Sequence, residues 1–351
     1  MSVTMESRTF IAVPPGATIK EQLRDRGMTQ KEFSARMDLS QKHVSKLING
    51  EVQLTPDTAY KLELVLGVPA SFWNNLEARY REQLAKVSAE NQMDEDIELS
   101  KSFPYREMMK LGWLPETRKA VERVTHLRKF FEVVNLGLVG EGLVPCVAYR
   151  RKANGPDSAL WAWAQKARVE AREIEAGPIN IARLEKALPE IRSMTTRDPS
   201  EFCPELVRLL SECGVALVFL PFLPGTGVHG ASFYDGRKIV CAMTVRGKDA
   251  DRFWFSLFHE LGHIVCGHLS ASNGTTEEQE HEADEFARNW LISPEDIERF
   301  EAEGHYAKQA ILRFSQEVGI APGIVVGRLQ NDRRLRHDQF NELKLKYELA
   351  D

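Results

Sequence analysis

The chain has 351 residues, of which 43% are hydrophobic and 28% charged, and its net charge at pH 7 is −5. This length is sufficient for two or three domains with separate cores. The negative charge excludes a chain coated with basic side chains, so any DNA contact must come from a local basic surface. The first ten residues lack the basic-then-apolar pattern of a signal peptide, and no stretch approaches the 18 apolar residues of a membrane span. We therefore expect a cytoplasmic protein without a membrane segment.

The cysteines agree with this expectation. They are odd in number and show no CxxC spacing, which favours reduced core residues over disulfides or metal ligands. The five residues are Cys146, Cys203, Cys213, Cys241 and Cys266.

Short helices are predicted from residue 19 to residue 84. Thr29 with Glu32 has the spacing of a capping box that opens one helix. A turn follows, Ser40 is a suitable N-cap for the next helix, and Gly50 ends it. Thr55 followed by proline begins a further helix. Two short helices joined by a tight turn are typical of a helix-turn-helix module.

The second of these helices has one apolar and one polar face. Val44, Leu47 and Ile48 form the stripe expected to be buried, and the segment 40–49 holds two lysines and no acidic residue. A helix of this kind can enter the major groove, where amides and ammonium groups contact bases and phosphates. The side chains left facing outward are Gln41, Lys42, His43, Ser45 and Lys46.

Four segments in this region resemble antitoxins of the HigA type, a branch of the Xre-like repressors. They read MTQKEFSARM, SQKHVSKLING, LTPDTAYKLELVLG and FWNNL, within residues 12–85. The resemblance implies a five-helix domain that binds double-stranded operator DNA as a homodimer. By motif position it assigns the DNA contacts to Gln30, Gln41, Lys42 and Lys46. The alternative is a small helical bundle that contacts only proteins.

The next two regions carry no recognisable chemistry. Residues 86–103 turn polar and acidic, which predicts a linker or a solvated helix end. Residues 104–214 have apolar residues at helical spacing and are expected to form a helical region. Trp161 and Trp163 in this region are interpreted as packing residues.

The pattern changes at residue 215, where a domain over 215–351 is expected. A short apolar run at 215–220 predicts a strand, and two further strands flank Asp235-Gly236, a strong hairpin signal. We expect a small antiparallel sheet, followed by helices at about 251–267 and 277–292. The fold class predicted for the whole chain is mainly α, within the α+β class.

His259, Glu260 and His263 form an HExxH motif on the first of these helices. Residues four apart lie on one face of a helix, so both imidazoles can reach one ion. Zinc accepts such nitrogen ligands and, in catalytic sites, takes three protein ligands. Glu260 lies beside the first ligand and can act as the general base. Two histidines in so apolar a helix would be costly to bury without partners.

The third ligand is sought on the following helix. With about 100° between successive residues, Glu280 lies on the order of 50° from the centre of the apolar stripe, and Glu282 on the order of 110°. Glu280 is therefore the predicted third ligand. Asp284, one turn further, is placed to hydrogen-bond the free nitrogen of a ligand histidine. The alternative is that this acidic run is entirely solvated.

These segments resemble the ImmA/IrrE family of metallopeptidases. The resemblance spans about residues 105–340 and rests on RFWFSLFHELGH, EHEADEFARNWLI and IAPGIVVGRLQ. It implies a gluzincin-like Zn²⁺ site, selects Glu280 by its position before Ala-Asp, and implies cleavage of one partner repressor or antitoxin. This chain departs from that arrangement because the DNA-binding segment and the peptidase segment share one polypeptide, so a separate repressor target is not given.

Three other histidines complete the set of candidates. His229 and His281 are possible transition-state donors, and His268 is interpreted as structural. The sequence thus predicts a DNA-binding transcriptional regulator with a zinc-dependent endopeptidase domain, whose partner is a repressor-like or antitoxin-like substrate or a toxin. The main alternative is a non-proteolytic HigA-like antitoxin or repressor with a structural or sensory metal site. Another metal-dependent hydrolase, such as an amidase, is a third possibility.

Overall fold

The computed structural model describes residues 4–7, 10–140, 158–244, 249–270 and 275–348, so Cys146 lies outside the described residues. The chain divides into two compact units, Met1–Glu98 and Leu99–Asp351, which are described separately. None of the described helices combines the length and apolar character needed to cross a bilayer.

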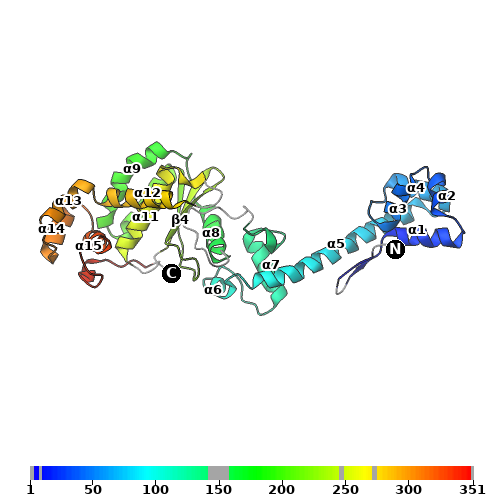
Figure 1. The fold of residues 1–351 in the computed structure, drawn as a ribbon, viewed down its shortest axis with the longest axis horizontal. Coiled ribbons are helices and arrows are strands. Elements are labelled where there is room, and N and C mark those ends of the chain that lie inside the picture. Colours follow the sequence, from blue (N-terminus) through cyan, green and yellow to red (C-terminus); the bar gives the residue numbers. More distant parts are fainter. Residues whose placement is uncertain (1–3, 8–9, 141–157, 245–248, 271–274, 349–351) are drawn as a thin grey trace. The chain divides into compact units, whose positions relative to one another are not determined.

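The first unit consists of five helices preceded by a small β-ribbon (Figure 1). Strands β1 (Met5–Glu6) and β2 (Ile11–Ala12) pair antiparallel. The helices are α1 (Pro15–Asp25), α2 (Gln30–Arg36), α3 (Gln41–Asn49), α4 (Pro56–Leu66) and α5 (Ala70–Ser100). The last helix includes residues 86–100, which were predicted as a linker or a solvated helix end, so the acidic segment continues a helix.

Local hydrogen bonds define where these helices begin. The side chains of Thr29, Ser40 and Thr55 each accept a hydrogen bond from the backbone N–H three residues ahead. Only half of the capping box predicted at Thr29 forms, because the carboxylate of Glu32 accepts hydrogen bonds from Arg36. Gly50 ends α3 in the left-handed conformation, with φ of 78°.

The core of the first unit is built from the apolar faces of all five helices. The predicted stripe of α3 lies in it, together with Phe33 from α2 and Trp73 from α5. The polar face of α3 is thereby held outward, since its opposite face is buried.

The second unit contains helices around a three-stranded sheet. The helices are α6 (Tyr105–Lys110), α7 (Ala120–Phe131), α8 (Ser158–Ala171), α9 (Ile181–Ser193), α10 (Pro199–Glu212), α11 (Ala250–Val265), α12 (Glu277–Leu291), α13 (Pro294–Ala302), α14 (Lys308–Val318) and α15 (Pro322–Asn331). Among the described residues, the short 3₁₀ helices are η1 (Leu136–Leu138), η2 (Met194–Thr196), η3 (His268–Ser270) and η4 (Asn341–Leu343). The molecule is thus mainly helical with small sheets, as predicted.

The sheet is mixed, which corrects the expectation of an antiparallel sheet. Its strands are β3 (Val215–Phe219), β4 (Gly230–Asp235) and β5 (Lys238–Met243), in the order β3-β5-β4. The hairpin β4-β5 is antiparallel, but β3 pairs parallel with β5. The segment between β3 and β4 carries the chain to the far edge of the sheet, so the returning strand β5 runs alongside β3 in the same direction.

The hairpin turn lies one residue later than the Asp235-Gly236 signal indicated. Asp235 pairs with Lys238, which leaves Gly236 and Arg237 as the two loop residues. Gly236 has φ of 62°, a conformation that favours glycine at the first position of such a turn.

Helix α11 lies within the second unit, beside α12 and against strands β4 and β5 (Figure 1). Its apolar side chains, including the fully buried Trp254 and Phe258, contribute to the core. This packing holds one turn of α11 between the sheet and α12, which is where the HExxH residues lie.

Candidate metal centre and DNA-binding helix

The two histidines of the HExxH motif project from consecutive turns of α11. Their Nε2 atoms lie 3.0 Å apart. The side chain of His263 is fully buried, and that of His259 is 18% exposed. Two nitrogen lone pairs at this distance repel each other unless a proton or a metal ion lies between them.

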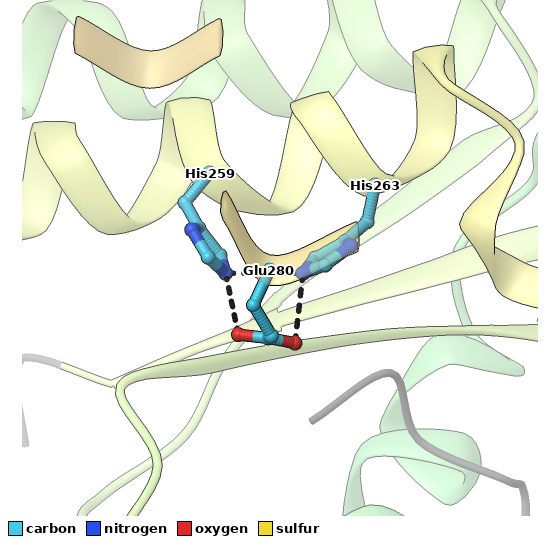
Figure 2. Close-up of side chains that lie close together, drawn as sticks. All are labelled: His259, His263 and Glu280. Atoms are coloured by element: carbon cyan, nitrogen blue, oxygen red, sulfur yellow. Dashed lines mark hydrogen bonds and ion pairs between the residues drawn. The ribbon is translucent and has the colours of Figure 1, made fainter. Parts of the chain in front are cut away.

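Glu280 of α12 approaches both histidines from the opposite side (Figure 2). One carboxylate oxygen lies 3.5 Å from His259 Nε2 and the other 3.4 Å from His263 Nε2. Helix α12 begins in a capping box formed by Thr276 and Gln279, which places Glu280 in its first turn. The structure therefore brings the three predicted ligands together.

Close packing of the two helices depends on Gly262. A Cβ atom at this position would lie 3.2 Å from the Cα of Ala283 and 3.1 Å from a ring carbon of Phe286. The glycine inside the HExxH motif thus allows α12 to approach α11 closely enough for Glu280 to reach the histidines.

The donor set fits a zinc ion. Zinc binds imidazole nitrogen and carboxylate oxygen at about 2.0–2.2 Å, so the donors around one ion lie within about 4 Å of one another. The two Nε2 atoms lie 3.0 Å apart, and each lies within 3.5 Å of a different oxygen of Glu280. His259, His263 and Glu280 are the residues that would hold the ion.

The charges at this centre favour a cation. Burial lowers the pKa of His259, but hydrogen bonds to Asp284 and Glu280 outweigh this effect and raise it to about 10. Burial raises the pKa of Glu280, whereas hydrogen bonds from His259, His263 and Thr275 hold it well below its usual range. The carboxylates therefore attract a proton or another cation to the imidazoles.

Each histidine has a hydrogen-bond partner on its outer nitrogen. His259 Nδ1 lies 2.8 Å from Asp284 Oδ1, the contact that the sequence predicted for a ligand histidine. His263 Nδ1 lies 3.0 Å from Nδ1 of His268, a residue interpreted from the sequence as structural. Such outer contacts fix the tautomer and the ring orientation of a metal-ligating histidine.

Glu260 points into a buried polar niche formed by strand β4. Its carboxylate accepts a hydrogen bond of 2.7 Å from Ser232, and burial raises the pKa of Glu260 to about 7. A Cβ atom on Gly230 would lie 2.8 Å from Glu260 Cγ, so the niche requires glycine at this point. A carboxyl group with this pKa is suited to exchange protons near neutral pH.

Ser232 and Gly230 were not identified from the sequence. They belong to an ordinary strand, and only the packing of β4 against α11 brings them to Glu260. Gly262 lies inside the HExxH motif, but the sequence alone did not show that it allows α12 to pack closely against α11.

The two predicted transition-state donors occupy different positions. The side chain of His281 is 75% exposed and its Nε2 lies 3.7 Å from Glu285, so the structure does not bring it into the cluster. His229 lines a cavity of about 310 Å³ together with Phe255 and Ser256 of α11. Phe255 lies one turn before His259, with the two ring centroids 6.5 Å apart, so this cavity adjoins the histidine cluster.

The DNA-contact residues predicted in the first unit are all exposed. Gln41, Lys42 and Lys46 lie on the outer face of α3, and Gln30 is at the start of α2. No acidic residue is present in α3, so its outer face is positive. Ser40 caps the N-terminus of α3 by accepting a hydrogen bond from His43 N–H, and a helix N-terminus is a suitable place for a phosphate.

Comparison with known proteins finds a match in each region. Residues 253–335 match Peptidase U49, and residues 19–73 match the Helix-turn-helix family. The Uncharacterized HTH-type transcriptional regulator YddM of Escherichia coli (strain K12) is 35% identical over 63 residues, which are 18% of this chain and 67% of that protein. The chain therefore belongs, through its N-terminal domain, to the helix-turn-helix family, and a domain similar to Peptidase U49 follows in the same polypeptide.

Proposed function

We propose that this chain is a DNA-binding transcriptional regulator with a zinc-dependent endopeptidase domain that cleaves a specific regulatory protein. The observation that carries the proposal is the meeting of His259, His263 and Glu280 beside the buried carboxyl group of Glu260. The match to Peptidase U49 supports peptide hydrolysis as the reaction. The helix-turn-helix match and the exposed lysines of α3 support operator binding.

Zinc, when bound, supplies Lewis acidity that polarises a peptide carbonyl and makes water more acidic. Glu260 accepts the proton of the attacking water and transfers it to the leaving amine. Ser232 holds the carboxylate of Glu260 in place by its hydrogen bond of 2.7 Å. Asp284 orients His259 through its contact of 2.8 Å.

Strand β4 offers a way to bind the substrate. It is an edge strand, since within the described part of the chain it pairs only with β5. An extended peptide can add to such an edge through main-chain hydrogen bonds. Because Gly230 and Ser232 of β4 contact Glu260, a peptide on this edge would run close to the catalytic carboxyl group.

The first unit has an exposed apolar surface that suits a homodimer. Tyr60 and Leu64 of α4 and Phe72 of α5 are 57%, 67% and 44% exposed. Tyr60 and Leu64 lie one turn apart on α4, and exposed apolar side chains that gather on one surface mark sites of protein association. A dimer joined here would present two copies of α3 to an operator, as many helix-turn-helix regulators do.

The substitution Glu260→Gln tests the proposal. The variant should keep zinc, folding and operator binding, while cleavage falls by about 10²–10⁴-fold because the proton acceptor is lost. New protein N-termini would be compared between cells that express the wild type and cells that express the variant. Glu285→Gln, at an exposed carboxylate of α12, is the matched control.

Two outcomes would separate the proposed function from its alternatives. A protein fragment that appears with the wild type and the control, but not with Glu260→Gln, supports the endopeptidase. Identical N-termini and identical target-gene expression in all three strains would contradict it. That result would leave a repressor or antitoxin whose metal site is structural or sensory.

A further inference from the structure

His268 is buried against the side of His263 that faces away from the candidate metal centre. The chain leaves α11 through Gly267, whose φ is 76°, and enters η3 directly afterwards. This reversal turns the imidazole of His268 back toward α11. Its side chain is 5% exposed, and its Nδ1 lies 3.0 Å from His263 Nδ1.

The other nitrogen of this imidazole contacts α12. His268 Nε2 lies 3.2 Å from Oε2 of Glu282. A continuous line of contacts therefore runs from Glu280 through His263 and His268 to Glu282. It begins and ends on the same helix, two residues apart.

Only one arrangement of protons lets His263 bind a metal in this line. A neutral imidazole that coordinates through Nε2 carries its hydrogen on Nδ1. His263 Nδ1–H must then donate to His268 Nδ1, which has to be the bare nitrogen. The hydrogen of His268 is consequently on Nε2, where it donates to the carboxylate of Glu282.

The opposite arrangement is disfavoured at both ends. If His268 donated from Nδ1, its Nε2 lone pair would face the negative carboxylate of Glu282. His263 would then carry its hydrogen on Nε2 and could not coordinate a metal. The charge of Glu282 thus selects the tautomer in which His263 is ready to bind.

We infer that His268 and Glu282 are positioning residues that hold His263 in its metal-binding tautomer, in parallel with the contact of Asp284 to His259. The inference rests on the proposed function, because it assumes that His263 is a zinc ligand. Helix α12 then supplies the third ligand and both outer carboxylates. Glu282 acts although it is 61% exposed, since the buried His268 transmits its effect.

A second metal site is the competing interpretation of the same residues. Ligand atoms of Cys266, His268 and Glu282 lie within 4.8 Å of one another. A metal on His268 Nε2 would leave a hydrogen on its Nδ1, facing Nδ1–H of a metal-bound His263. Two donors would then oppose each other at 3.0 Å without an acceptor, so the two sites are poorly compatible.

Zinc affinity, measured by competition with a chelator at constant pH, tests the inference. Contacts of this kind commonly contribute 10–100-fold to metal affinity, so His268→Leu and Glu282→Ala should each weaken zinc binding by about 10-fold or more. His268→Asn should restore most of the affinity, because its Oδ1 takes the position of Nδ1 as an acceptor. Cys266→Ala should change nothing.

Two further measurements separate positioning from a general structural effect. The melting temperature of each metal-free variant reports folding, and the visible spectrum of the cobalt-substituted protein reports the geometry of the ligands. We expect altered cobalt spectra for His268→Leu and Glu282→Ala at similar melting temperatures. If His268→Leu does not fold, the comparison of Glu282→Ala with His268→Asn decides, since Glu282 is exposed.

The possible contrary results are distinct. Wild-type affinity in both His268→Leu and Glu282→Ala, with zinc lost in Glu280→Ala, would overturn the inference and leave the proposed function intact. Two zinc ions per wild-type chain and one in Cys266→Ala would establish the second metal site instead. A wild-type protein without zinc affinity would overturn the proposed function and the inference together.

Discussion

The two regions of this molecule place their functional side chains in opposite ways. In the first unit, Gln41, Lys42 and Lys46 are exposed on one face of a single helix. In the second unit, the candidate site is assembled from two helices and a strand, and Glu260 and His263 are buried. The outer face of α3 is formed by residues close together in the sequence. The candidate metal centre forms only when segments distant in the sequence pack together.

The difference follows from the chemistry that each region requires. Lysines that contact phosphates must be reachable by a partner, and their charge does not need a protein counter-ion. A metal ligand and a general base must be held in fixed geometry, and burial shifts the pKa of the base toward neutral pH. Burial raises the pKa of Glu260 to about 7. The exposed face of α3 offers no burial that could shift a pKa in this way.

The largest expected effect comes from removing the carboxylate that joins α12 to the histidines. Glu280→Ala should weaken zinc binding by more than about 100-fold, because a ligand contributes more than the outer contacts that account for 10–100-fold. Operator binding should be unchanged if the two regions are independent. Elemental analysis and chelator competition measure the first effect, and a gel-shift titration measures the second.

Glu285→Ala is the matched control, since it removes an exposed carboxylate from the same helix. Full zinc occupancy in Glu280→Ala would show that another residue is the third ligand. Loss of operator binding in the same variant would show that the two regions are coupled.

A smaller effect is expected in the first unit. Lys42→Ala combined with Lys46→Ala should lower the salt dependence of operator binding by about 2 in the slope of log affinity against log salt, because each lost phosphate contact contributes about 1. The fold should survive, since both side chains are exposed. Zinc affinity should not change.

The control for this pair is Lys61→Ala with Lys86→Ala, which removes the same charge from α4 and α5. Gel-shift titrations of all three proteins over a range of salt concentrations provide the comparison. Equal slopes for both double variants would show that α3 has no special role in DNA contact.

The smallest of these effects, about tenfold for one pH unit, concerns protons at the metal centre. Because the pKa of His259 is raised to about 10, this imidazole carries a proton at pH 7, and zinc must displace it. Zinc affinity should therefore rise with pH, by about tenfold per unit below pH 10. Calorimetric titrations in two buffers with different ionisation enthalpies should show release of about one proton per zinc.

Asp284→Asn sharpens this test, because it removes a carboxylate that raises the pKa of His259. The variant should lower the pH at which the proton release per zinc falls to half of its maximum. The same half-release pH in both proteins would mean that Asp284 does not control the pKa of this histidine.

Much of the first unit can be predicted from the sequence, because the interactions that define its helices are local. The caps at Thr29, Ser40 and Thr55 act over three residues, and the burial of α3 follows its own helical periodicity. The long helix α5 is the exception. Its acidic second half gave no clear apolar stripe, so a linker and a helix end were equally compatible with the residues.

In the second unit, the sequence by itself determined the spacing of His259 and His263 and the inward position of Glu280. Helical geometry sets both, and this geometry is a property of a single segment. The sequence did not predict how closely α12 approaches α11. This distance depends on the absence of a Cβ atom at Gly262 and on the side chains that pack around it.

Only the tertiary structure decided the parallel pairing of β3 with β5, the hydrogen bond from Ser232 to Glu260 and the line from His263 through His268 to Glu282. Each depends on segments that are distant in sequence or on a chain reversal after a helix, and no periodicity encodes such meetings. Helical phase alone placed Glu282 on an outer flank. Glu282 becomes relevant to the metal centre because the buried His268 lies between Glu282 and His263.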